Sequence, residues 1–274
     1  MTAPPATITF LGTAGARNMV SKQLLASGGM WMDLAGVQIL MDPGPGCIVQ
    51  ATKRNFDPTK LSAIILSHRH IDHSNDVNIM IEAMTEGGLK KRGLVFAPSD
   101  ALEGDPVILK YVRSFPEKII VLTAGQTHRI GDVSFTLPAR HKHGVETYGF
   151  NFELPGVSFS YIPDTRFFQG LVDAYHGQVL IINVVRREGG HPFDHLSLPD
   201  VKTIVEGIKP RAAVMTHFGM NMWRGKPWEL AEGLSRETGI KVLAARDGMK
   251  LDLHELVQLA ATRDDAASPG DGDL

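Results

Sequence analysis

The chain has 274 residues and a formal net charge of −2; 43% of its residues are hydrophobic and 21% are charged. These values exclude a disordered chain and predict a globular protein, one large domain or two small ones, with an extensive core. The near-neutral charge provides no global attraction to nucleic acid or an anionic membrane, so any phosphate recognition must be local.

The first residues, MTAPPATITF, lack both a basic start and a long apolar segment. The longest apolar runs, such as Val179–Val185, are far shorter than the ~20 residues that span a bilayer. We therefore expect a soluble, cytoplasmic protein without a membrane partner. The single cysteine, Cys47, cannot form an internal disulfide and is interpreted as a packed residue.

Predicted strands dominate the first part of the chain, and strands alternate with helices later. Early strands are expected within residues 6–16, 37–46, 61–67, 93–99 and 117–141, with a helix across 76–92. Later strands are expected at 157–165, 179–185 and 212–218, helices at 197–209 and 227–237, and a closing hairpin at 241–253. This order predicts a layered α/β architecture with two central sheets. We expect one domain over residues 1–260 and a disordered tail over 261–274.

The stretch SHRHIDHSND, Ser67–Asp76, places several polar side chains directly behind an apolar strand. Four of them have the spacing H-x-H-x-D-H: His68, His70, Asp72 and His73. A lone histidine is usually a satisfied surface or core residue, but four such groups in six positions favour a site for zinc or a similar metal. The alternating His68 and His70 can reach one metal, while Asp72 and His73 can reach a second.

Further ligand-type residues stand where later apolar runs meet turns. They are His141, His143, Asp164 and His217. Each alone could be an ordinary turn or helix-cap residue, but their recurrence at separate strand ends predicts that they complete the metal site.

These motifs resemble those of the metallo-β-lactamase-fold hydrolases, over Thr7 to about Leu253. The resemblance implies a four-layer αββα sandwich with a site for two divalent metal ions. Zn²⁺ is the favoured metal, and Mn²⁺ and Fe²⁺ are the alternatives. It implies one metal on His68, His70 and His143, a second on Asp72, His73 and His217, and Asp164 as a bridge. Similar members place the third-motif histidine six residues before a pair like Gly149-Phe150, which favours His143; His141 is the alternative.

Two departures narrow the activity that the resemblance implies. A histidine at position 70, where di-iron oxygen and nitric oxide reductases have a glutamate, argues against those enzymes. Only 52 residues, 165–216, separate Asp164 from His217. That is too few for the nuclease domain that DNA-repair and RNA-processing members insert there.

The placement of His195 resembles that in ribonuclease Z and in the cyclic phosphodiesterases of phosphonate breakdown, where such a histidine reaches the scissile phosphate. Leu196 follows it where ribonuclease Z has an acidic residue, and no basic, glycine-rich arm is found. We therefore favour a small or cyclic phosphodiester as the substrate over nucleic acid. The alternatives are a lactone or thioester hydrolase, a tRNA 3′-processing endonuclease, and a metal-binding protein without hydrolytic activity. Homodimer formation is left open.

The expected mechanism is attack on phosphorus by a metal-bridging hydroxide, with Asp72 and His195 as catalytic candidates. His195 would stabilise charge on the phosphate or protonate the leaving alkoxide; alternatively, it is a helix-terminal residue bonded to Asp194. Asp42 is interpreted as orienting a ligand histidine. Three residues precede His195 on a loop and could contact an anionic substrate, although a solvated turn is the simpler interpretation: Arg186, Arg187 and His191.

Overall fold

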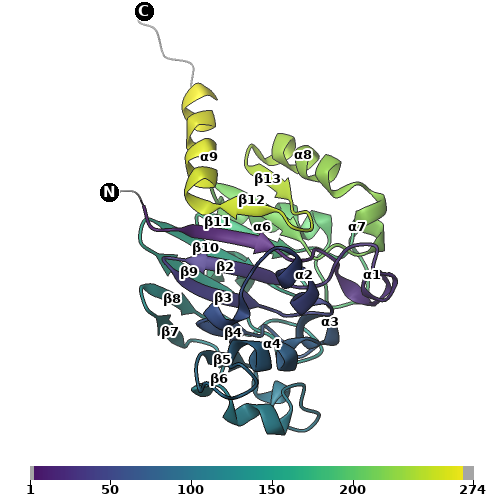
Figure 1. Ribbon diagram of the computed structural model, residues 1–274. Helices are drawn as coiled ribbons and strands as arrows, with labels where there is room; N and C mark the ends of the chain where they lie inside the picture. Colours follow the sequence, from purple (N-terminus) through teal and green to yellow (C-terminus); the bar gives the residue numbers. More distant parts are fainter. Residues whose placement is uncertain (1–2, 268–274) are drawn as a thin grey trace, which may run out of the picture.

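The computed structural model describes residues 3–267, in which two sheets lie face to face with helices on their outer sides (Figure 1). The first sheet has seven strands, in the spatial order β14 (Lys250–Asp252), β1 (Ala6–Phe10), β2 (Met30–Leu34), β3 (Val37–Met41), β4 (Ala63–Ile65), β5 (Leu94–Ala97) and β6 (Lys118–Val121). The second also has seven, in the order β13 (Lys241–Ala244), β12 (Ala212–Thr216), β11 (Val179–Asn183), β10 (Val157–Ile162), β9 (Phe150–Leu154), β8 (Val133–Thr136) and β7 (Thr127–Ile130).

Helices connect and cover these strands. The α-helices are α1 (Ala16–Lys22), α2 (Cys47–Lys53), α3 (Ile71–Ser74), α4 (Val77–Met84), α5 (Gly170–Ala174), α6 (Leu198–Ile208), α7 (Met220–Arg224), α8 (Pro227–Thr238) and α9 (Leu253–Ala267). Short 3-10 helices are η1 (Pro58–Lys60), η2 (Ser99–Ala101) and η3 (Lys110–Ser114). No helix within residues 3–267 is long and apolar enough to cross a bilayer.

Successive side chains along each strand lie on opposite faces of its sheet, which divides the core into three layers. Residues such as Phe10 and Phe152 point between the sheets, while Ile64 points outward beneath α2 and α4. On the other side, Ile182 belongs to the layer beneath α6 and α8. This α/β/β/α order confirms the predicted four-layer sandwich. Cys47 is buried in the layer on the first sheet, as expected for a packed residue.

Strand direction brings the loops of the site to one edge. Strands β3 to β6 are parallel in the first sheet, and β10 to β13 are parallel in the second. Because the carboxyl ends of parallel strands meet at the same edge, the segments that follow them are brought together. The candidate ligands after β4, β10 and β12 are on such segments.

Three local predictions differ from the structure. The closing hairpin is wrong, because β13 pairs with β12 in one sheet while β14 pairs with β1 in the other. The helix predicted across 76–92 ends at Met84, since Glu86, Gly87 and Gly88 adopt φ values of 53°, 70° and 79°. Helix α9 continues through Ala267, so the first part of the expected tail is helical, and residues 268–274 lie outside the described residues.

Candidate metal centre

The candidate ligands come together from separate parts of the chain. The loop after β4 and the short helix α3 supply the H-x-H-x-D-H motif, and later loops supply His143, Asp164 and His217. They form three groups, in each of which the ligand atoms lie within 4.8 Å of one another: His68, His70 and His143; His68, His73 and Asp164; and Asp72, His73 and His217. All the residues assigned to the metals from sequence are therefore adjacent in the fold.

His68 presents an unpaired ring nitrogen to the first group. The Ser67 hydroxyl donates to Asp42 at 2.7 Å, so Ser67 Oγ can only accept from Nδ1 of His68, 3.0 Å away. The Nε2 atom of His68 then carries a lone pair, and it is buried without a hydrogen-bond partner among the described residues. A buried, oriented lone pair of this kind is suited to a metal ion.

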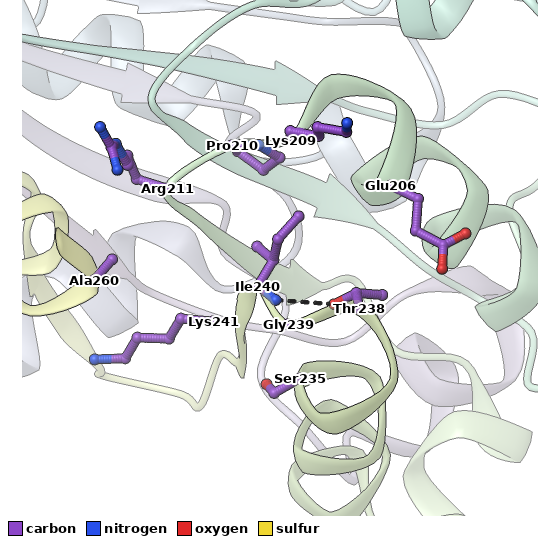
Figure 2. A pocket seen from close by; sticks show the side chains of 10 residues that line it. All are labelled: Glu206, Lys209, Pro210, Arg211, Ser235, Thr238, Gly239, Ile240, Lys241 and Ala260. Atoms are coloured by element: carbon purple, nitrogen blue, oxygen red, sulfur yellow. Dashed lines mark hydrogen bonds between the residues drawn. The ribbon is translucent and has the colours of Figure 1, made fainter. Parts of the chain in front are cut away.

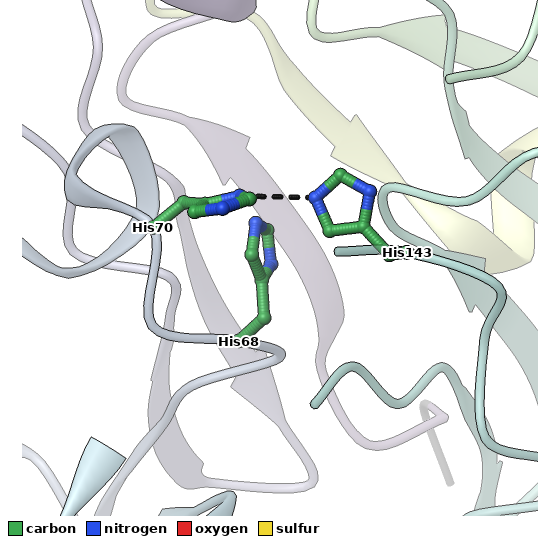
Figure 3. A group of neighbouring side chains, drawn as sticks. All are labelled: His68, His70 and His143. Carbon is green, nitrogen blue, oxygen red and sulfur yellow. Dashed lines mark hydrogen bonds between the residues drawn. The ribbon is translucent and has the colours of Figure 1, made fainter. Parts of the chain in front are cut away.

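His143 completes this first group with His70 (Figure 3). Nδ1 of His143 lies 2.9 Å from the carbonyl oxygen of Asp194, to which it donates, and Nε2 lies 2.9 Å from Nδ1 of His70. His141, the alternative ligand, instead has its Nε2 2.5 Å from the Tyr175 hydroxyl. The geometry therefore favours His143 and gives His141 a structural role.

The group of Asp72, His73 and His217 is oriented by a carboxylate behind it. Nδ1 of His73 lies 3.1 Å from Oδ2 of Asp42, which leaves Nε2 facing His217, 2.9 Å from that residue's Nε2. Asp72 Oδ2 is 3.4 Å from the same His217 nitrogen. Asp42 therefore occupies the orienting position expected from sequence.

Asp164 lies between the group of His68, His70 and His143 and the group of Asp72, His73 and His217. Its Oδ2 is 3.6 Å from His73 Nε2 and 3.9 Å from His68 Nε2, while Oδ1 is 3.3 Å from His217 Nδ1. Asn183, at the end of β11, donates to Oδ1 at 2.9 Å and fixes the carboxylate. This placement is compatible with a bridging ligand.

The protonation states of His68, His70 and Asp164 favour ligation. Burial lowers the pKa of His68 well below its usual range and, with the charge of His143, lowers that of His70 to about 4. Burial alone would raise the pKa of Asp164, but the charge of His217 and a hydrogen bond from His73 hold it well below its usual range. The neutral His68 and His70 and the ionised Asp164 are forms that bind divalent metals. His73 differs: burial would lower its pKa, but the charge of Asp72 and hydrogen bonds with Asp164 and Asp42 raise it well above its usual range, so a metal ion would have to displace a proton from His73.

A tight backbone contact positions His217, which has a φ of 60° directly after β12. Gly15 packs against it so closely that a Cβ at this position would overlap the His217 carbonyl oxygen and Nδ1. Asp247 anchors the Gly15 loop, since its carboxylate accepts from Thr13 N at 2.9 Å and from Ala26 N at 2.7 Å. The turn before β14 thus supports the metal ligand after β12.

A cavity of about 630 Å³ opens beside the ligands and contains His195. The ring of His195 is 20% exposed, and its Nδ1 lies 3.4 Å from Asp164 Oδ2. Among the described residues Asp194 forms no hydrogen bond with that ring; its carboxylate pairs instead with Arg166 at 2.5 Å. His195 therefore stands at the boundary between the ligands and the space for a substrate.

A second cavity, of about 470 Å³, lies at the opposite ends of the parallel strands (Figure 2). Its basic residues Lys209, Arg211 and Lys241 surround the points where β12 and β13 begin. None of the candidate metal ligands lines it, whereas His70, Asp72 and Asp164 line the cavity beside His195.

Some supporting residues were not identified from the sequence. Tyr161 donates its hydroxyl to Asp42 at 3.1 Å, and Asn183, Ser67 and Asp247 support the ligands as described above. Asn183 had a detectable signal, because it is a polar residue inside the apolar run 179–185. Asp247 had none, since its partners are 221 and 234 residues away.

Comparison with known proteins agrees with this arrangement. Residues 38–218 match the family described as the β-lactamase superfamily domain. An uncharacterised protein of Methanocaldococcus jannaschii is 34% identical over 256 residues, covering 90% of this chain and 94% of that protein. A ribonuclease Z of Methanopyrus kandleri is 27% identical over 154 residues, which cover 54% of this chain and 50% of that enzyme.

Solved structures share the fold at lower identity. The metallo-β-lactamase-fold protein YhfI of Bacillus subtilis superimposes with a TM-score of 0.75 and 18% identity, covering 91% of this chain and all (100%) of that one. A diphosphatase from the PhnP family gives a TM-score of 0.66 and 20% identity, covering 90% and 96% of the two chains. The chain therefore belongs to the β-lactamase superfamily of metal-dependent hydrolases and has the metallo-β-lactamase fold.

Proposed function

We propose that the protein is a dinuclear metal-dependent phosphodiesterase that hydrolyses a small or cyclic phosphodiester. The observation that carries the proposal is the position of His195, with Nδ1 3.4 Å from the Asp164 carboxylate and its ring lining the adjoining cavity. A titratable group at this boundary can serve a substrate held against the metal centre.

His68, His70 and His143 would hold one metal ion, and Asp72, His73 and His217 a second, with Asp164 shared. Zinc suits these nitrogen and carboxylate donors. When bound, such ions lower the pKa of water from about 15.7 to roughly 7 and polarise a phosphoryl oxygen.

The protein's own groups orient and assist this chemistry. Asp42 and Ser67 fix the tautomers of His73 and His68, so that both present Nε2 to the centre. His195 is free to donate a proton to the leaving alkoxide or to stabilise charge on a non-bridging oxygen, because its Nδ1 has no hydrogen-bond partner among the described residues.

The size of the cavity and the comparisons support this substrate class. A volume of about 630 Å³ lies within the roughly 300–1,000 Å³ typical of small-molecule sites. Two of the similar proteins are named as a diphosphatase and a ribonuclease Z, which both break phosphorus–oxygen bonds. Without the basic arm expected of tRNA-processing members, a small ester is preferred over tRNA.

A His195→Ala variant tests the proposal. With aryl and alkyl phosphodiesters of graded leaving-group pKa, kcat should fall by about 10²- to 10⁴-fold, most strongly for the poorest leaving groups. Metal content should stay at the wild-type value. His176→Ala, which changes a histidine hydrogen-bonded to Asn151 outside the metal groups, is the control and should retain full activity. Unchanged kcat in His195→Ala across the series would contradict the proposal.

A further inference from the structure

A third cavity, of about 680 Å³, opens beside the edge strand β13. Among residues 3–267 this strand has a neighbour, β12, on one side only, and it lies beside α8 (Figure 1). Residues 242–246 line the cavity in succession. Because successive side chains of a strand point to opposite faces, a cavity lined by all five residues includes the open edge of the strand. None of the candidate metal ligands lines it.

Helix α8 covers only the first part of this edge. The Ser235 hydroxyl accepts a hydrogen bond from the backbone N–H of Val242 at 2.9 Å. Ala245 instead directs its N–H to the Met215 carbonyl on β12, at 2.8 Å. Since the backbone groups of alternate residues point to opposite sides of a strand, those of Ala244 point to the open side, as those of Val242 do. An open edge of this kind is a template for pairing with another chain.

The side chains around the open edge are mainly apolar. Trp223 and Trp228 line the cavity and are 37% and 55% exposed. Tryptophan is enriched among the residues that anchor protein interfaces, where it fills a pocket of the partner. Each copy of the chain therefore offers both an apolar hollow and an exposed indole ring that could fill such a hollow.

The cavity also carries one unpaired cation and one unpaired anion. Arg246 and Glu232 line it and are exposed, and neither forms an ion pair with another residue in the described part of the chain. In a dimer with a two-fold axis the same surface meets itself, so Arg246 of each copy can face Glu232 of the other. The surface is thus complementary in charge to a second copy of itself.

We propose that two copies of this chain associate across a two-fold axis through the β13 edge and its cavity. Arg246 of each copy lies against Glu232 of the other, and Trp228 of each copy enters the cavity of the other. The inference does not depend on the proposed phosphodiesterase function. The cavity is also lined by Phe218, which directly follows the candidate ligand His217, so the second copy covers the outer side of that loop.

Charge reversal tests the inference. Sedimentation velocity of the full chain should show a dimer with a Kd of about 1 μM or lower. Arg246→Glu and Glu232→Arg should each raise this Kd by at least about 10-fold, because like charges then face each other. Combining the two changes should restore a Kd within about threefold of the wild-type value. Arg129→Glu, at an exposed residue on the opposite edge of the same sheet, is the control and should leave the Kd unchanged.

Tryptophan fluorescence locates the contact. Trp31 is 2% exposed, so a shift of the emission to longer wavelength on dilution of the dimer would come from Trp223 and Trp228. We expect this shift in the wild-type protein, and a dimer without it would overturn the inference.

Three further outcomes would also overturn the inference. They are a dimer that neither reversal weakens, a dimer that the combined change does not restore, and a monomeric wild-type protein. A monomer whose tryptophan emission is quenched by anilinonaphthalene sulfonate would assign the cavity to a small ligand instead.

Discussion

Oδ2 of Asp42 lies 3.1 Å from Nδ1 of His73 and accepts the Ser67 hydroxyl at 2.7 Å, so one buried carboxylate orients ligands of both metal groups. Replacing it by asparagine removes a charge that fixes two imidazole tautomers. Asp42→Asn should weaken metal affinity by about 10- to 100-fold, measured by competition with a chelating dye.

The control for this change is Asp33→Asn. Asp33 lies in β2, opposite Thr7 and Gln38 in the neighbouring strands, and is not in any of the metal groups. The Asp33→Asn variant should therefore keep the metal affinity of the wild-type protein. Equal affinities of Asp42→Asn and the wild-type protein would show that Asp42 does not orient the ligands.

The choice between His141 and His143 gives a second prediction. Wild-type protein should bind two metal ions per chain, and His143→Ala, which removes a ligand of the first group, should bind about one. His141→Ala should keep both ions but lower the free energy of unfolding by about 1–3 kcal/mol, since Tyr175 loses a buried partner. Elemental analysis and chemical denaturation measure the two effects; metal loss in His141→Ala alone would reverse the assignment.

Gly15→Ala tests the backbone contact at His217. The added methyl group would overlap the carbonyl oxygen and Nδ1 of His217, so the ligand or the loop must shift. We expect loss of metal from the group that contains His217 and at least a 10-fold fall in kcat, because ligand geometry tolerates little displacement. A crystal structure of the variant with His217 and its metal unmoved would rule this out.

Gly233→Ala is the matched glycine change with the opposite expectation. Gly233 lies inside α8, and apart from its chain neighbours and the backbone of its own helix an added Cβ would have no described atom within 4 Å. Alanine costs less backbone entropy in a helix, so the variant should gain about 0.5–1 kcal/mol in free energy of unfolding at unchanged activity. Thermal or urea denaturation reports the difference, and a less stable variant would be inconsistent with the open surroundings of this glycine.

Asp247→Ala tests the long-range support of the Gly15 loop. Losing the acceptor for Thr13 N and Ala26 N should lower the free energy of unfolding by about 1–3 kcal/mol, because Thr13 is buried and its N–H would be left without a partner, whereas water can reach the N–H of Ala26. Activity should fall further than stability alone explains, since Phe218 N donates to the Thr13 carbonyl beside His217. Full activity in a destabilised variant would limit Asp247 to a structural role.

The fold and the ligands could be predicted from the sequence because their signals are local. Apolar runs ending in His68, Asp164 and His217 mark both the strands and the chemistry at their ends. The H-x-H-x-D-H spacing adds a motif that an ordinary surface loop rarely contains. These features need no knowledge of distant contacts.

The missed features depend on contacts between distant segments. Residues 241–253 have the sequence pattern of a β-hairpin, with two short strands around a turn. In the structure, however, Val242 packs beneath the helices of the second sheet, whereas Leu251 packs between the two sheets. The role of Asp247 depends on Thr13, 234 residues away. Arg186 could be interpreted as an ordinary turn residue until Phe193 was placed 4.4 Å from its guanidinium.

The most direct test of the central claim compares two reactions on one preparation. Zinc-loaded and manganese-loaded protein is assayed with bis(p-nitrophenyl) phosphate and with an acyl-homoserine lactone. We predict phosphodiester turnover that is lost on chelation and restored by metal. Lactone turnover without phosphodiester turnover would contradict the proposed function.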